Sequence, residues 1–173
     1  MACTVAMLTS ELHSPIACPA VNGSDGCDAL IERAIALKRA ERGGCGEKPL
    51  RGKHLGLICE RPNSPDAELF QRAASRLGAR VACIKPEVAD SLDAEQVTHT
   101  AHLLGRLYDA VECQGLSGEY IGVVRSAAGI PVLDGIARDN ELVSQCEATV
   151  NRRTGDTDGR LYLLQAALLG IFD

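Results

Sequence analysis

Hydrophobic positions follow two patterns along this chain: short continuous runs, and positions repeated every three to four residues. Continuous apolar runs bounded by charged or turn-forming residues indicate buried strands, and they occur at 54–59, 80–84, 109–113 and 130–133. The helical spacing predicts helices over 26–42, 65–77, 93–107, 117–128, 140–149 and 161–172. Strands that alternate with helices are typical of an α/β fold, here an open parallel sheet of about four strands with helices on both faces.

Capping and turn residues indicate where a ligand site would lie on this fold. Ser64 is expected to cap the helix over 65–77, because its hydroxyl can accept from the first free backbone N–H groups. Open parallel sheets bind ligands beyond the carboxyl ends of their strands, often at a helix N-terminus. The loop over 60–66 is therefore the first candidate site, and the loops after Cys113 and Leu133 are the others.

Length and charge narrow the class of protein. The 173 residues carry 18 Lys and Arg against 23 Asp and Glu, a net charge of −5 without a basic run, which excludes a strongly basic nucleic-acid binder. No run reaches the roughly 18 apolar residues that a membrane helix needs. Residues 1–12 lack the basic and apolar parts of a secretory signal. We expect a cytoplasmic protein with no nucleic-acid and no membrane partner.

The eight cysteines include no CxxC pair, which argues against a zinc ribbon or a thioredoxin-type motif. Free cysteines within predicted strands are expected to act as small buried apolar residues, and these are Cys59, Cys83 and Cys113. A further group precedes the first strand, namely Cys3, Cys18, Cys27 and Cys45, and a disulfide within this group is an open alternative.

Several other polar residues have both a structural and a functional interpretation. His99 and His102 lie three apart on a predicted helix, a spacing that can hold a metal, but a solvated or interface pair is favoured and no metal or cofactor is expected. Asp66 can act as an acid or base, although an acid in the first turn more simply favours the helix dipole. Arg61 and Arg138 can either support anion binding or lie solvated at the surface.

Five segments in a fixed order resemble the carbamoyl-phosphate domain of the ornithine and aspartate carbamoyltransferases, the ornithine branch most closely. They are GKHLGLICERPNS (52–64), LGARV (77–81), LLGRLYDAV (103–111), AAGIPVLDG (127–135) and GRLYLLQAALLGIF (159–172). Residues 1–23 show no hydrophobic period and are predicted to be a flexible arm. The resemblance implies an α/β core over 24–150, and a loop and C-terminal helix over 151–173 that packs back on the core. The amino-acid-binding domain that the family carries between core and last helix is absent from this stretch.

The same resemblance implies a degenerate ligand site. The family binds phosphate with a Ser-Thr-Arg-Thr-Arg segment, and here that place reads Asn63, Ser64, Pro65, Asp66 and Ala67. An arginine that polarises the carbamoyl carbonyl is replaced by Gln114, and only Gln145 remains of a His-Pro-x-Gln segment. At about 4 Å, Asp66 would repel each unit of phosphate charge by roughly 4 kcal/mol at an effective dielectric of 20. The candidate ligand-binding residues are thus Asn63, Ser64, Asp66, Ala67, Gln114 and Gln145, and no catalytic residue is assigned.

Two functions follow as hypotheses. The first is a catalytically inactive carbamoyltransferase-like protein that binds a small anion such as carbamoyl phosphate or phosphate weakly, or acts in assembly or regulation. It would be a homo-oligomer, with a trimer favoured, and association with a true carbamoyltransferase is part of this hypothesis. The second is an active transferase with a modified phosphate or acyl donor that uses Ser64, Gln114 and Gln145 with an arginine such as Arg61.

Overall fold

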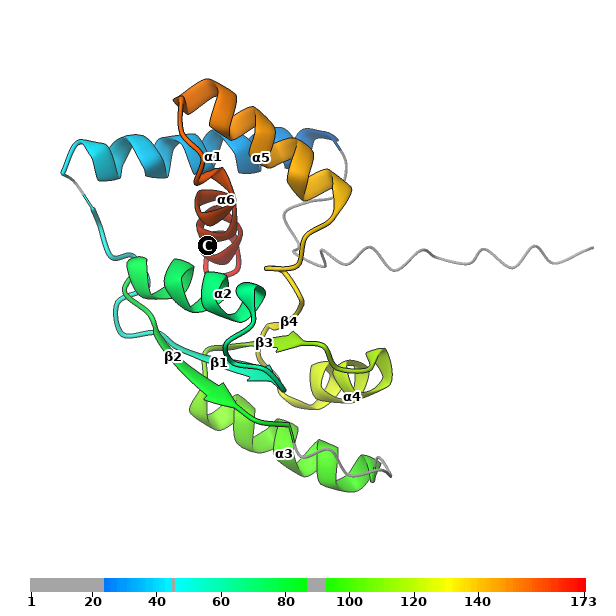
Figure 1. Ribbon diagram of the computed structural model, residues 1–173. Coiled ribbons are helices and arrows are strands. Elements are labelled where there is room, and N and C mark those ends of the chain that lie inside the picture. The colour runs from blue at the N-terminus through cyan, green and yellow to red at the C-terminus, as the bar shows by residue number, and fades with distance from the viewer. Residues whose placement is uncertain (1–23, 45, 87–92) are drawn as a thin grey trace, which may run out of the picture.

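The computed structural model describes residues 24–44, 46–86 and 93–173 (Figure 1). The elements follow in the order α1 (Ser24–Arg42), β1 (His54–Cys59), α2 (Pro65–Arg76), β2 (Arg80–Ile84), α3 (Ala94–Leu107), β3 (Ala110–Gln114), α4 (Gly118–Ala127), β4 (Val132–Asp134), α5 (Glu141–Thr154) and α6 (Gly159–Gly170). The arm expected over 1–23, with Cys3 and Cys18, lies outside the described residues, and so does Cys45. Each predicted strand and helix is present, with bounds that differ by a few residues.

The four strands form one parallel sheet in the order β2-β1-β3-β4. The chain runs from β1 outward to β2 and then returns to the other side of β1 to form β3. This reversal creates a crevice between the carboxyl ends of β1 and β3, which is where open α/β sheets bind ligands. The predicted α/β fold is confirmed, and the crevice lies beside the loop over 60–66 that the sequence indicated.

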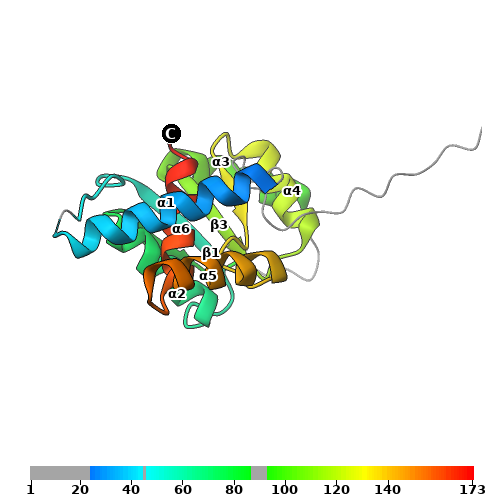
Figure 2. The same ribbon diagram turned by 90° about the horizontal axis from the view of Figure 1, so that it is seen from above.

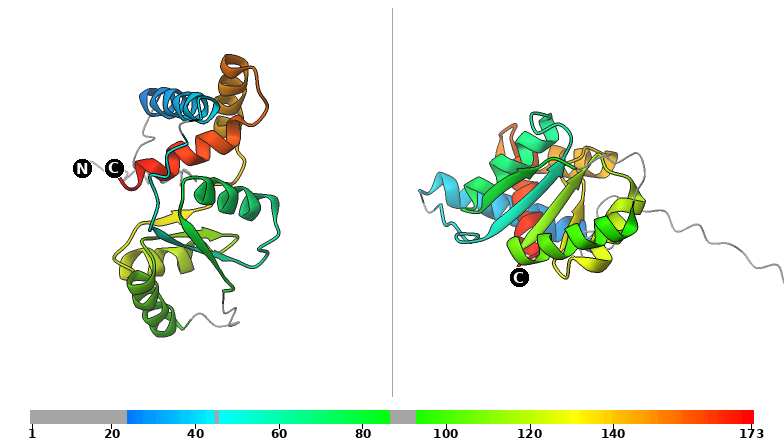
Figure 3. Two further views of the ribbon diagram at one scale, coloured as in Figure 1. Left: turned by 90° about the vertical axis from the view of Figure 1, so that its left-hand side faces the viewer. Right: turned by 90° about the horizontal axis from the view of Figure 1, so that it is seen from below.

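The helices are stacked in layers around the sheet (Figures 1, 2 and 3). Helices α3 and α4 cover one face, while α2 and α6 cover the other, and α1 and α5 lie beyond α6 as a further layer. Helix α6 is apolar on almost all sides, and its residues from Leu161 to Leu169 are buried. A helix that is hydrophobic all round belongs in a protein interior, so α6 is a central element of the core.

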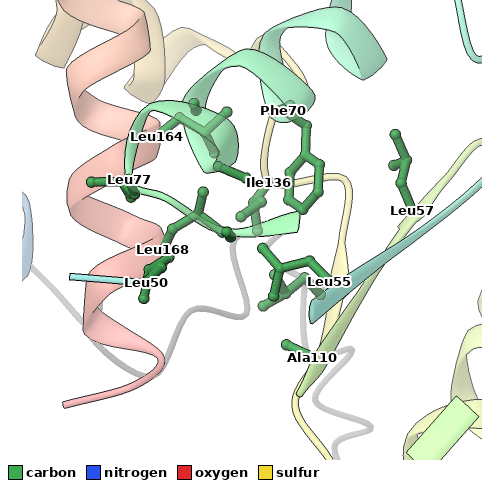
Figure 4. Packing of buried hydrophobic residues seen from close by; sticks show 14 of the residues in the cluster. Leu50, Leu55, Leu57, Phe70, Leu77, Ala110, Ile136, Leu164 and Leu168 are labelled. Atoms are coloured by element: carbon green, nitrogen blue, oxygen red, sulfur yellow. The ribbon is translucent and has the colours of Figure 1, made fainter. Parts of the chain in front are cut away.

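The largest core cluster lies between the sheet, α2 and α6 (Figure 4). It includes Leu55, Leu57, Phe70, Leu77, Ile136, Leu164 and Leu168. Ile58, Val111 and Val124 belong to a second cluster on the opposite face, under α3 and α4. Each fully buried side chain of this size contributes roughly 1.5–3 kcal/mol relative to exposure. The two clusters hold β1 and β3 in fixed positions, and with them the crevice between their ends.

Two expectations from the sequence are wrong. Cys83 is exposed rather than buried, because β2 is an edge strand of the sheet. None of the five residues of β2 is buried, whereas five of the six residues of β1 are. The polar segment from 151 onward was expected to be a loop, but α5 continues to Thr154 and ends at Gly155, which adopts the left-handed conformation with φ 74°. Polar residues there cover the outer side of a helix whose inner side, at Cys146 and Val150, is buried.

Candidate functional site

The loop after β1 and the start of α2 form one side of the crevice. Ser64 caps α2 as predicted: its Oγ accepts from the backbone N–H of Ala67 at 3.3 Å, and Pro65 occupies the first helical position. Residues 60–66 line an open hollow of about 650 Å³ at this point. The helix N-terminus therefore faces a space large enough for a small molecule, and its dipole favours negative charge there.

Gln114 forms the other side, because it ends β3 and is in register with Cys59 at the end of β1. Its Nε2 donates to the backbone oxygen of Asp66 at 3.4 Å and to Oε1 of Glu112 at 3.3 Å. The side chain of Gln114 thus spans from β3 to the first turn of α2. The neutral amide at this position holds the loop in place and supplies no positive charge.

The six residues predicted for the site do not all lie together. Asn63, Ser64 and Asp66 line the hollow, Ala67 follows them in α2, and Gln114 contacts the backbone of Asp66. Gln145 lies on the exposed side of α5, where its Nε2 donates to Oε1 of Glu141 one turn earlier, at 3.5 Å. The structure therefore places Asn63, Ser64 and Asp66 at the hollow. Ala67 and Gln114 lie next to them without lining it, and Gln145 lies elsewhere.

Arg160, from the start of α6, supplies positive charge near this crevice. Its Nη2 donates a hydrogen bond to the backbone oxygen of Ala137 at 2.7 Å. The same Nη2 lies 3.9 Å from Oδ1 of Asp66. Its Nη1 lies 3.1 Å from Oδ2 of Asp139. The Ser144 hydroxyl, and after it the Arg160 guanidinium, hold the pKa of Asp139 below its ordinary value. The positive charge of Arg160 is thus already matched by carboxylates of the same chain.

Glu112 lies on β3 directly behind Gln114 and is completely buried. The pKa of its carboxyl is raised to about 8, mainly by burial and to a lesser extent by the nearby Asp134, although the Gln114 amide and the backbone N–H groups of Ala137 and Ile136 act to lower it. At neutral pH this carboxyl is therefore mostly protonated. Within the described residues, Oε2 of Glu112 and Oε1 of Gln114 are buried without a hydrogen-bond partner.

Ala67 limits what this crevice can hold. Its exposed fraction is 0%, and it belongs to the core cluster between the sheet and α2. A long cationic side chain at this position would have to displace packed apolar neighbours, which typically costs 1–3 kcal/mol or more. The hollow itself is lined by Glu60, Arg61 and Asp66 as its charged residues, so its net charge is negative. The arrangement can hydrogen-bond a small ligand but opposes a dianion.

Arg160 and Glu112 were not identified from the sequence. Arg160 is distant in sequence from the other residues, and only the packing of α6 against α2 brings it near Asp66. The sequence could have indicated Glu112, because a single acid in the middle of the apolar strand AVECQ must be buried together with its neighbours.

Metal sites and membrane-spanning helices were the other features to look for in the described residues. Within residues 24–44, 46–86 and 93–173, no group of three or more His, Cys, Asp or Glu side chains is placed to hold a metal ion. His99 and His102 both lie exposed on α3, in agreement with a solvated pair. In this same part of the chain, no helix is long and apolar enough to span a bilayer.

Comparison with known proteins shows similarity to carbamoyltransferases. No profile of a known protein family matches the sequence. The catabolic ornithine carbamoyltransferase of Burkholderia mallei is 33% identical over 141 residues, which cover 82% of this chain and 42% of that protein.

Solved structures show the same fold. The ornithine carbamoyltransferase from Burkholderia thailandensis matches with a TM-score of 0.61 at 16% identity, over 77% of this chain and 46% of that chain. The catalytic subunit of M. jannaschii aspartate transcarbamoylase matches with a TM-score of 0.58 at 18% identity, over 78% of this chain and 45% of that chain. This chain therefore spans less than half of the length of each of these three proteins.

Proposed function

Since the chain is a homologue of the ornithine and aspartate carbamoyltransferases, we propose that it is a carbamoyltransferase-like assembly or regulatory protein that does not transfer carbamoyl groups. It retains the scaffold of the carbamoyl-phosphate domain, with at most weak binding of a small anion at the N-terminus of α2. The observation that carries this proposal is the charge around that helix N-terminus: Asp66 stands in the first turn, and the nearby Arg160 is paired with Asp66 and Asp139.

The chemistry of carbamoyl transfer explains why this arrangement opposes activity. The reaction requires preorganised positive charge at the carbonyl oxygen and at the leaving phosphate. Here Gln114 is neutral and uses its amide to hold the backbone of Asp66, while Ala67 is packed in the core. The positions where the resemblance implies arginines therefore provide no positive charge, and at Ala67 the packing leaves no room for one.

Self-association is the second part of the proposal. Leu103 and Leu107 lie one turn apart on α3 and are exposed, with 44% and 64% of their surface accessible. Two neighbouring exposed leucines on one helix are suited to contact with another subunit, and the resemblance favours a trimer. A cytoplasmic location is part of this proposal.

An active transferase with a different donor is the alternative. One observation favours it: Arg61 lines the hollow together with Ser64, so one cation remains beside the capped helix N-terminus. An anion bound there would contact Ser64, the α2 backbone and Arg61, with Gln114 at the opposite side.

Calorimetric titration separates the two functions. The wild-type protein is titrated with carbamoyl phosphate and with inorganic phosphate, and product formation is assayed with ornithine and with aspartate as acceptors. The proposal expects no binding tighter than about 1 mM, which corresponds to roughly −4 kcal/mol, and no product. Tighter binding that is lost in Ser64→Ala, or product formation, would establish the alternative instead.

A gain-of-binding variant makes this test sharper. The double substitution Pro65→Arg and Asp66→Thr adds a cation at the exposed position 65 and removes the negative charge of the half-buried Asp66, and it leaves the buried Ala67 unchanged. We expect phosphate affinity to rise at least tenfold. Glu68→Thr, which removes an acid from the same first turn, is the matched control and should change affinity much less. For the assembly role, light scattering at micromolar concentration should give a mass above that of the monomer, and a monomer would contradict it.

A further inference from the structure

Two cysteines from distant parts of the sequence line one small cavity. Cys27 lies in the first turn of α1 and Cys146 in the middle of α5, and both line a cavity of about 40 Å³ between these helices and α6. Cys146 is buried in the apolar cluster formed by α1, α5 and α6, and the partly buried Cys27 packs against the same cluster. The two thiols therefore face one another across a helix–helix contact.

The environment gives the two sulfurs different roles. The pKa of Cys146 is raised to about 11, mainly by burial and then by the neighbouring Cys27 thiol, to which its side chain is hydrogen-bonded. Cys146 therefore stays protonated and shielded from solvent at neutral pH. Cys27 is partly exposed near the start of α1, so a small reagent from solvent reaches it first.

We propose that Cys27 and Cys146 form a redox modification site, in which hydrogen peroxide converts the thiol pair to a disulfide that joins α1 to α5. This inference is independent of the proposed function. The sulfur of Cys27 attacks one peroxide oxygen, the O–O bond breaks, and a water molecule leaves, which produces a sulfenic acid. The sulfur of Cys146 then loses its proton and attacks the sulfur of Cys27, and the sulfenic oxygen leaves as the second water. The two thiols lose two electrons, peroxide is reduced to two waters, and a dithiol reductant reverses the change.

The other cysteines near one another are less well placed, which gives the site selectivity. Cys59 and Cys83 lie on the neighbouring strands β1 and β2 and on the same face, but Cys83 is opposite Leu57, two residues away from Cys59. Diagonal neighbours in a sheet lie about 7–8 Å apart, beyond the range of about 4.4–6.8 Å that a disulfide joins. Cys113 is in register with Ile58, so it lies on the opposite face of the sheet.

Peptide mapping after oxidation tests this directly. Trypsin leaves Cys3, Cys18 and Cys27 on one peptide, residues 1–33, because no Lys or Arg precedes position 33. The experiment therefore uses the full chain with Cys3→Ser and Cys18→Ser, treated with peroxide, alkylated and digested. We expect a cross-linked pair of peptides 1–33 and 139–152, the latter containing Cys146 alone, and its loss after dithiothreitol.

Thermal unfolding provides the second readout. A disulfide that closes a loop of more than 100 residues should raise Tm by about 5–10 °C, reversibly with dithiothreitol. The variants Cys27→Ser and Cys146→Ala should show no such rise, and Cys83→Ser should behave like the parent. Full alkylation of Cys27 after peroxide treatment, a cross-link between Cys59 and Cys83 instead, or the same rise in Cys27→Ser would each overturn the proposal. Because the peptide map is made on a chain that retains both cysteines, the result does not depend on whether Cys146→Ala folds.

Discussion

The ammonium group of Lys38 lies 2.8 Å from Oδ2 of Asp156, which ties the middle of α1 to the loop between α5 and α6. The same group pairs with Asp158 and lies 4.8 Å from the centre of the Tyr162 ring, and only 3% of the lysine side chain is exposed. The contact therefore fixes the short connection that leads into α6. This connection stands where the carbamoyltransferase resemblance implies a second domain, so the ion cluster stabilises the core with α6 joined directly to it.

Replacement of Lys38 by methionine should lower the free energy of unfolding by about 2–3 kcal/mol. Methionine keeps most of the buried stem but leaves Asp158 without its cation and Asp156 with Arg42 alone. The cost is expected below the 3–5 kcal/mol of a fully buried pair, because both aspartates remain partly hydrated. Urea unfolding measures the change. Arg33→Met, which removes an exposed ion pair with Asp173 from the same helix, should cost less than about 1 kcal/mol, and equal losses in both variants would contradict the prediction.

Glu112 predicts a specific dependence of stability on pH. An unfolded glutamate loses its proton near pH 4.5, whereas the pKa of about 8 in the fold keeps Glu112 protonated. Between these values the folded state binds the extra proton, so the contribution of Glu112 to the free energy of unfolding falls as pH rises and levels off above pH 8. Glu112→Gln cannot ionise, so its stability relative to wild type should increase by about 3 kcal/mol between pH 5 and pH 8.

Urea unfolding of both proteins across this range provides the measurement. Glu119→Gln, at an exposed position at the start of α4, controls for the loss of one negative charge. A stability difference between Glu112→Gln and wild type that does not change with pH would show that Glu112 is ionised in the folded protein.

The absence of a side chain at Gly105 allows α3 to pack closely against the end of α4. A Cβ atom at this position would lie 1.9 Å from the backbone oxygen of Ala128, so Gly105→Ala has to push the two helices apart. We expect a loss of about 3 kcal/mol or more in the free energy of unfolding. Gly122→Ala, on the outer side of α4 with no atom within 4 Å of the added Cβ, should be neutral or stabilising by up to about 1 kcal/mol. A similar effect of both substitutions in chemical unfolding would show that helix propensity, not packing, decides the outcome.

Local signals explain why so much of the fold could be predicted. The run from His54 to Cys59 matches β1 residue for residue, because its apolar residues are bounded by charge on both sides. Ser64 and Pro65 together specify the start of α2, since one accepts the free N–H and the other has the backbone angle that a first helical residue needs. These signals are contained within a few consecutive residues, so a single sequence is sufficient to read them.

Residues whose environment depends on distant contacts could not be predicted in this way. Cys83 has the same local sequence signal as Cys59, and only the strand order β2-β1-β3-β4 makes β2 the exposed edge. Arg160 reaches Asp66 through the packing of α6 against α2, and Cys146 meets Cys27 through the packing of α5 against α1. Each of these relationships requires the tertiary arrangement of helices that no local pattern encodes.

Substitution of Leu168 tests whether α6 packs on its own chain in solution. Leu168 is fully buried between α6, α2 and the sheet, so Leu168→Ala should lower the free energy of unfolding by about 3–4 kcal/mol. Arg72→Ala, at an exposed position on α2, should change it by less than about 0.5 kcal/mol. Urea unfolding at protein concentrations a hundredfold apart completes the test. If α6 packs within one chain, the loss in Leu168→Ala is the same at both concentrations. A loss that depends on concentration would show that α6 is exchanged between subunits, because only then does the contact of Leu168 form on association.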